Sequence, residues 1–96
     1  MQNLEEIKDK LRGHKNTLSE KYHISQLSVF GSYARGDQKE NSDLDLLVDF
    51  KENIGIKIID LAEELEQIIG LKVDLISRNA LKNRYFAAIE KELVNV

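Results

Sequence analysis

The sequence predicts one α+β domain with an α/β-like crossover, spanning residues 1–96. Apolar residues recur at helical spacing in three segments, and three short segments alternate apolar and polar side chains as strands do. A helical segment separates the second and third of these strands, and it is long enough to connect two parallel neighbours in one sheet. A chain of 96 residues can enclose a single hydrophobic core, which favours one small domain.

The first half of the chain is expected to form a helix followed by two strands. Residues 3–22 carry apolar side chains at helical spacing. Gly13 within this helix costs about 1 kcal/mol relative to Ala and is a candidate bend. A strand is predicted over residues 24–31. The polar connection 36–42, rich in Gly, Asp, Asn and Ser, then leads to a second strand over residues 43–50.

The second half is expected to form a helix, a strand and a last helix. Residues 55–69 have one apolar face, and Gly70 is well placed to end this helix in the left-handed conformation. The third strand is predicted over residues 71–76 and the last helix over residues 81–93. Because the helix over residues 55–69 can act as a crossover, the strands on either side of it are predicted to be parallel neighbours.

Two acidic residues stand on the second predicted strand. Alternation along the strand puts Asp43 and Asp45 on one face, about 6.6 Å apart at about 3.3 Å per residue. It puts Leu44, Leu46 and Val48 on the other face. A strand that is otherwise apolar must compensate the desolvation of two neighbouring carboxylates, and a bound divalent cation does this commonly. The leading interpretation is therefore a metal site.

A third acid follows on the next strand. If the second and third strands pair about 4.8 Å apart, Asp74 joins Asp43 and Asp45 in one cluster. Three carboxylates repel one another strongly unless cations are present. Two Mg²⁺ ions about 3.5 to 4 Å apart would satisfy them, with phosphate oxygens and waters as further ligands. The alternatives are solvent-facing acids on an amphipathic strand or a structural cation site.

A Gly-Ser turn ends the first predicted strand. Gly31 allows the backbone to approach a ligand closely, and Ser32 with the following backbone N–H groups offers donors to a phosphate. Arg35 is a candidate charged donor, with a surface charge as its alternative, and Tyr33 is interpreted as a packing residue. The turn by itself is also compatible with a plain strand end.

Composition excludes several classes of function. The chain has no cysteine, so neither a disulfide framework nor a thiolate metal site is possible. Its start lacks the features of a signal peptide, and no apolar stretch approaches the roughly 20 residues that span a bilayer. A cytoplasmic location without membrane contact is expected by elimination. The net charge of −3 argues against strong direct binding of nucleic acids. The charged residues within 63–67 and 90–92 are interpreted as solvated helix faces.

Three motifs together resemble those of the nucleotidyltransferases of the DNA polymerase β superfamily, and among them the minimal nucleotidyltransferase (MNT) domains. They are Gly-Ser-Tyr-Ala-Arg-Gly at residues 31–36, Asn-Ser-Asp-Leu-Asp-Leu-Leu-Val at residues 41–48 and Val-Asp-Leu-Ile at residues 73–76. Each motif alone is weak, whereas the set with its spacing is specific, and the resemblance covers nearly the whole chain. It implies a palm-like fold, a small mixed β-sheet with flanking helices.

The resemblance also implies a reaction and the residues for it. A nucleoside triphosphate, with ATP as the expected substrate, would be attacked at its α-phosphorus by an acceptor hydroxyl, and pyrophosphate would leave. Asp43 and Asp45 would hold two Mg²⁺ ions, and Asp74 would bind the catalytic one and help to activate the hydroxyl. Gly31 and Ser32 would bind the triphosphate.

Small MNT proteins of this type resemble the antitoxin halves of toxin–antitoxin pairs whose partner is a HEPN-domain ribonuclease. The resemblance therefore implies transfer of AMP from ATP to a tyrosine of such a toxin, which would be both complex partner and substrate. One alternative is a non-catalytic antitoxin that neutralises its partner by forming a complex. Another is nucleotidyl transfer to a small molecule such as an aminoglycoside, although that reaction requires an acceptor-binding domain that these 96 residues lack.

Overall fold

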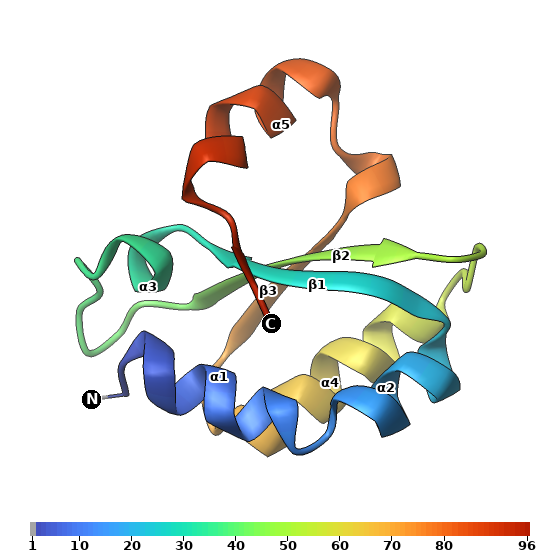
Figure 1. Cartoon of the computed structure of the whole chain (residues 1–96), viewed down its shortest axis with the longest axis horizontal. Helices are drawn as coiled ribbons and strands as arrows, with labels where there is room; N and C mark the ends of the chain where they lie inside the picture. Colours follow the sequence, from blue (N-terminus) through green and yellow to red (C-terminus); the bar gives the residue numbers. More distant parts are fainter. Residues whose placement is uncertain (1) are drawn as a thin grey trace.

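A mixed four-stranded sheet forms the centre of the computed structural model, which describes residues 2–96 (Figure 1). The strand order is β3-β2-β1-β4. Along the chain the elements are α1 (Leu4–Arg12), α2 (Lys15–Tyr22), β1 (Ile24–Phe30), α3 (Ser32–Arg35), β2 (Leu44–Phe50), α4 (Lys57–Ile69), β3 (Val73–Ser77), the 3₁₀ turn η1 (Arg78–Ala80), α5 (Asn83–Ile89), the 3₁₀ turn η2 (Glu90–Glu92) and β4 (Val94–Asn95).

The strand pairing confirms the predicted crossover. β2 and β3 are parallel neighbours joined by α4, whereas β1 pairs antiparallel with both β2 and β4. Gly70 ends α4 with a φ of 81°, and its N–H donates to the Glu66 carbonyl, as the sequence predicts. The observed architecture is therefore the α+β fold with a small mixed sheet and flanking helices that the resemblance implies.

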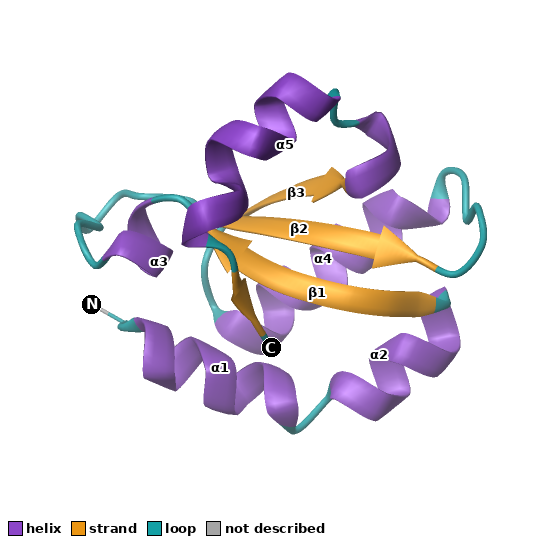
Figure 2. Ribbon diagram, turned by 45° about the horizontal axis from the view of Figure 1, so that its top comes forward, coloured by secondary structure: helices purple, strands orange, loops and turns teal. Residues whose placement is uncertain are grey.

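The two faces of the sheet differ in their covering. α1, α2 and α4 lie over one face, whereas α5 lies over the opposite face (Figure 1, Figure 2). Leu44, Leu46 and Val48 of β2 are fully buried in the core on the first face, so the predicted alternation is confirmed. The helices fill this core with Ile7, Leu11, Leu18, Tyr22, Leu61, Leu65 and Ile69.

The predicted helix over residues 3–22 is wrong in one respect, because it consists of two helices. α1 ends at Gly13, the candidate bend, and α2 begins after His14. Both helices pack their apolar side chains against the core. The change of direction at Gly13 allows this, because a single straight helix would diverge from the twisted sheet. His23 then ends α2 in the left-handed conformation, with a φ of 56°.

The predicted helix over residues 81–93 is also too long. α5 ends at Ile89, and the chain continues through η2 into β4, whose Asn95 and Val94 pair with Ser28 and Val29 of β1. A strand of two residues has no periodicity to recognise in a sequence, so only its partner strand defines it. No helix of residues 2–96 has the length and apolar character that crossing a bilayer requires.

Polar contacts tie the helices of the covered face together. The Tyr22 hydroxyl of α2 donates to Glu64 Oε2 of α4 at 2.6 Å, and Lys21 contacts the same carboxylate at 3.1 Å. The hydrogen bond from Tyr22, followed by that from Lys21, lowers the pKa of Glu64. Burial, followed by the Glu64 contact, raises the pKa of Tyr22. The pair fixes α2 on α4 beneath the sheet.

Candidate active site at the edge of the sheet

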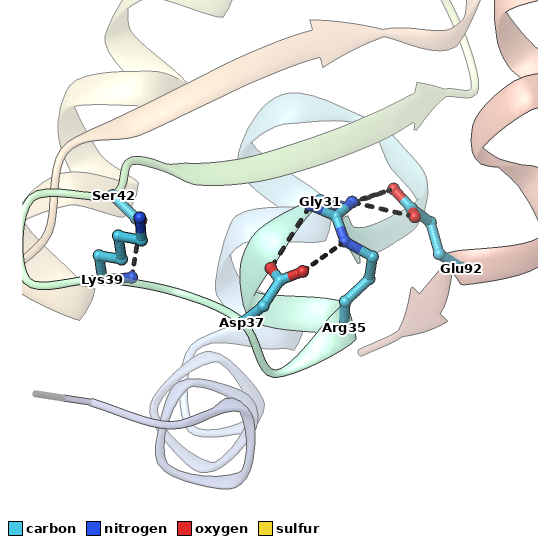
Figure 3. A network of polar contacts seen from close by, with 6 residues as sticks. All are labelled: Gly31, Arg35, Asp37, Lys39, Ser42 and Glu92. Atoms are coloured by element: carbon cyan, nitrogen blue, oxygen red, sulfur yellow. Dashed lines mark hydrogen bonds and ion pairs between the residues drawn. The ribbon is translucent and has the colours of Figure 1, made fainter.

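Two of the three predicted acids, Asp45 and Asp74, lie near the amino-terminal ends of β2 and β3, on the sheet face that α5 covers (Figure 1, Figure 2). Asp45 and Asp74 are register partners on β2 and β3, so their side chains project from the same face. Asp43 immediately precedes β2 and is exposed, as is Asp74, whereas Asp45 is partly buried. The preceding loop is ordered by Lys39 and Ser42, because the Lys39 N–H donates to Ser42 Oγ at 2.9 Å (Figure 3). The structure thus pairs Asp45 with Asp74, and Asp43 lies close enough to Asp45 for its charge to act on that carboxyl.

Negative charge accumulates around Asp45. Burial is the largest cause that raises the pKa of this carboxyl, and the charges of Asp74 and then Asp43 raise it further. The positive charge of Arg35 acts in the opposite direction. Within residues 2–96 no three carboxylates or imidazoles converge tightly enough to enclose a metal by themselves. Mg²⁺ is commonly held by one or two carboxylates with waters and substrate phosphates as the other ligands, and this site fits that pattern.

Gly31 lies directly against Asp45. Its neighbour Phe30 is the register partner of Asp45, so the turn after β1 stands beside the acidic strand. A Cβ at Gly31 would overlap Asp45 Oδ2 and lie 3.0 Å from its Cγ. The backbone of Gly31, with a φ of 74° and a ψ of −152°, lies in a region that is essentially restricted to glycine. Glycine is therefore needed here both for the conformation and for the close approach.

The residues after Gly31 form the short helix α3. Ser32 is the first residue of α3, and its carbonyl accepts the N–H groups of Gly36 and Asp37 at 2.8 and 3.0 Å. Tyr33 is 1% exposed and belongs to the core, which confirms its interpretation as a packing residue. Arg35 is exposed at the end of α3, and its Nε donates to Asp37 Oδ2 at 3.0 Å.

A fourth acid enters the site from the C-terminal segment, and sequence reasoning missed it. Glu92 Oε1 accepts the Gly31 N–H at 2.9 Å, and Glu92 Oε2 lies 3.1 Å from Arg35 Nη1 (Figure 3). The side chain of Glu92 is 24% exposed, so the interpretation of residues 90–92 as a solvated helix face is wrong for this residue. Only the pairing of β4 with β1 brings η2 to the Gly31 turn.

A cavity of about 150 Å³ lies on the same side of the sheet as Asp45. Leu47 of β2, two residues after Asp45, is part of its floor. The guanidinium of Arg78 lies 3.9 Å from the centre of the Phe86 ring at another wall. The cavity is lined by Gln26, Ser28, Leu47, Asp49, Arg78, Phe86 and Leu93.

Comparison with known proteins gives a consistent result. Residues 11–95 match the sequence profile of the nucleotidyltransferase domain. A protein of Methanocaldococcus jannaschii, provisionally named a protein adenylyltransferase, is 46% identical over 98 residues that cover all of both chains. The protein adenylyltransferase MntA of Thermococcus cleftensis is 44% identical over 97 residues, which cover 100% of this chain and 98% of that protein.

Solved structures show the same fold. A provisionally named minimal nucleotidyltransferase superimposes with a TM-score of 0.83 and 32% identity, over 99% of this chain and 97% of that one. A chain in the structure of tri-AMPylated Shewanella oneidensis HEPN toxin with MNT antitoxin superimposes with a TM-score of 0.67. That match has 16% identity over 93% of this chain and 70% of the other, so it indicates a shared fold.

Proposed function

The chain belongs to the nucleotidyltransferase domain family, and from this premise we propose that it transfers AMP from ATP to a tyrosine hydroxyl of a HEPN-domain partner toxin. The observation that carries this proposal is the contact of the Gly31 turn with Asp45, beside the register partner Asp74. Relatives named protein adenylyltransferases match the full length of the chain at 44 to 46% identity. The complex that contains a tri-AMPylated HEPN toxin supports the choice of acceptor.

The three acids are the proposed holders of two Mg²⁺ ions. Asp43, Asp45 and Asp74 supply the hard carboxylate oxygens that Mg²⁺ prefers, and the raised pKa of Asp45 reflects a site that needs positive charge. When bound there, Mg²⁺ would lower the pKa of the acceptor hydroxyl and stabilise negative charge on the phosphate and the leaving pyrophosphate.

The Gly31 turn binds the triphosphate in this proposal. The backbone N–H of Gly31 and the hydroxyl of Ser32 donate to phosphate oxygens, and Arg35 adds a charged donor. Because Gly31 lies close to Asp45, a triphosphate bound at this turn would lie beside Asp45, which supports this part of the proposal. Such positioning accelerates the reaction because the reacting groups are held at short distance before the chemical step.

The chemical step exchanges one phosphorus–oxygen bond for another. The acceptor oxygen attacks the α-phosphorus, a new oxygen–phosphorus bond forms, and the bond to the β-phosphate oxygen breaks with departure of pyrophosphate. The proton of the hydroxyl passes to Asp74 or to water. The acceptor ring approaches across the sheet face that α5 covers, where the cavity of about 150 Å³ lies over Leu47, two residues after Asp45 on β2. The partner protein thus supplies the acceptor.

Transfer of labelled AMP tests the proposed function. The purified chain is incubated with Mg²⁺, ATP labelled at the α-phosphate and a HEPN-domain protein from the same organism. We expect label on the HEPN protein, and a loss of at least about 100-fold with Asp45→Asn, because charge stabilisation by the metal is lost. Asp60→Asn on α4 is the matched control, since Asp60 is an exposed acid outside the site.

The non-catalytic alternative gives the opposite result. If the chain neutralises the toxin by forming a complex alone, Asp45→Asn will protect against the toxin as well as the wild type does. Equal labelling by the wild type and Asp45→Asn, or no labelling by either, contradicts the enzymatic function.

A further inference from the structure

Glu92 occupies the donors that a triphosphate needs. Its two carboxylate oxygens accept the Gly31 N–H at 2.9 Å and lie 3.1 Å from Arg35 Nη1 (Figure 3). A carboxylate and a phosphate present the same kind of group, an anion with acceptor oxygens, and both prefer charged or backbone N–H donors. The Gly31 N–H has one hydrogen to donate, so a phosphate oxygen that takes this hydrogen bond must displace Glu92.

The surroundings make Glu92 an occupant that can be displaced. Glu92 accepts the Gly31 N–H, and Gly31 lies directly against the Asp45 carboxylate, so two like charges meet at this turn. The contacts with Gly31 and Arg35 oppose this repulsion. The Glu92–Arg35 pair is partly solvated, with side chains 24% and 49% exposed, and such pairs contribute little to stability.

We infer that Glu92 is an internal substitute for a phosphate. Its carboxylate occupies the triphosphate site until a nucleotide binds and displaces it. This role of Glu92 rests on the proposed function. The apparent affinity for ATP is then lower than the affinity of the open site, because only the fraction of molecules with Glu92 released can bind. Glu92 therefore sets the affinity for nucleotide without contacting it.

Displacement of Glu92 also affects the segment formed by α5 and η2, which covers one face of the sheet. Glu92 lies at one end of the segment formed by α5 and η2, which arches over the sheet face (Figure 1, Figure 2). No side chain of α5 is fully buried, so few packing contacts hold this helix in place. Leu93, the next residue, forms part of the cavity wall. Release of Glu92 therefore loosens the α5–η2 segment where the acceptor side chain is proposed to enter. In this proposal nucleotide binds first and the acceptor second.

Nucleotide binding to Glu92→Gln tests this role. The wild type and the variant are titrated calorimetrically with Mg²⁺ and α,β-methylene-ATP, which cannot be cleaved between the α- and β-phosphates. Because the amide lacks the negative charge that favours the Arg35 contact, we expect the Kd of the variant to fall about fivefold or more. Glu90→Gln is the matched control, because Glu90 is an exposed acid on the same turn. Binding by Glu92→Gln that equals or is weaker than wild-type binding overturns the inference.

A second measurement does not depend on the variant. Hydrogen exchange of the wild-type amides in residues 83–92 should become faster when the analogue binds, because Glu92 no longer anchors the segment. Slower or unchanged exchange there overturns the inference even if Glu92→Gln fails to fold.

The two proposals fail in different ways. If the wild type transfers AMP but Glu92→Gln does not bind the analogue more tightly, only the proposed role of Glu92 is wrong. If Glu92→Gln binds the analogue more tightly but the wild type transfers no AMP to a HEPN protein, only the proposed function is wrong. If neither protein binds the analogue, both are wrong.

Discussion

Replacement of Gly31 by alanine tests the contact on which the site is built. The backbone conformation of Gly31 costs a residue with a side chain about 1–3 kcal/mol. The added Cβ also overlaps the carboxylate of Asp45, which must leave its rotamer at a cost of about 0.5–1.5 kcal/mol. Together these effects predict that Gly31→Ala lowers the free energy of unfolding by about 1.5–4.5 kcal/mol.

Gly70→Ala is the matched control for this experiment. Gly70 also has a positive φ, of 81°, but a Cβ there meets no atom closer than 3.9 Å. Left-handed backbone costs alanine about 1–2 kcal/mol, and both substitutions reduce the entropy of the unfolded chain equally. Urea denaturation should therefore show a smaller loss for Gly70→Ala than for Gly31→Ala.

Activity separates the two variants more strongly than stability. A displacement of Asp45 by about 1 Å can lower the rate about 100-fold, so AMP transfer by Gly31→Ala should be at least that much slower. Gly70→Ala, measured at a temperature at which it is folded, should transfer AMP like the wild type. If Gly31→Ala is as stable as Gly70→Ala and retains transfer, the inferred contact between Gly31 and Asp45 is wrong.

Further predictions concern two tyrosines and the charge of Asp45. Tyr22→Phe removes the hydrogen bond to Glu64 and should lower the free energy of unfolding by about 1–3 kcal/mol, as measured in urea. Tyr33→Phe removes a buried hydroxyl that has no hydrogen-bond partner, and the same measurement should show equal or higher stability; a clear loss would reveal a partner for it. Because burial, and then the charge of Asp74, raises the pKa of Asp45, the folded chain binds a proton there more readily than the unfolded chain. Without Mg²⁺, stability should therefore decline as the pH rises through and above the usual range of an aspartate, and Asp45→Asn should flatten this decline in thermal unfolding with EDTA. An unchanged slope in the variant would show that Asp45 is not the group responsible.

Much of the site could be predicted because short-range patterns determine it. The alternation of side chains along a strand predicted that Asp45 points away from the core that buries Leu44 and Leu46. The length of the helix before Gly70 indicated the parallel pairing that brings Asp74 beside it. The Gly-Ser turn after the first strand was predicted as well, whereas the close approach of Gly31 to Asp45 became visible only in the structure. The roles of these residues in binding metal and nucleotide stay predictions until the variants are measured.

Other features depend on contacts between distant parts of the chain. Gly31 and Glu92 are 61 residues apart, and no local pattern distinguishes Glu92 from the exposed Glu90 two residues before it. The end of the last helix was misjudged for the same reason, because β4 exists only as a partner of β1.

The amino-acid sequence by itself determined the acidic positions, the Gly-Ser turn and the parallel pairing of β2 with β3, because backbone periodicity and steric limits act within a few residues. Only the tertiary structure decided that a fourth carboxylate occupies the donors of the Gly31 turn and that a loosely packed helix covers the sheet beside it. Those features follow from hydrogen bonds and packing across the sheet, and such interactions form only when remote segments meet.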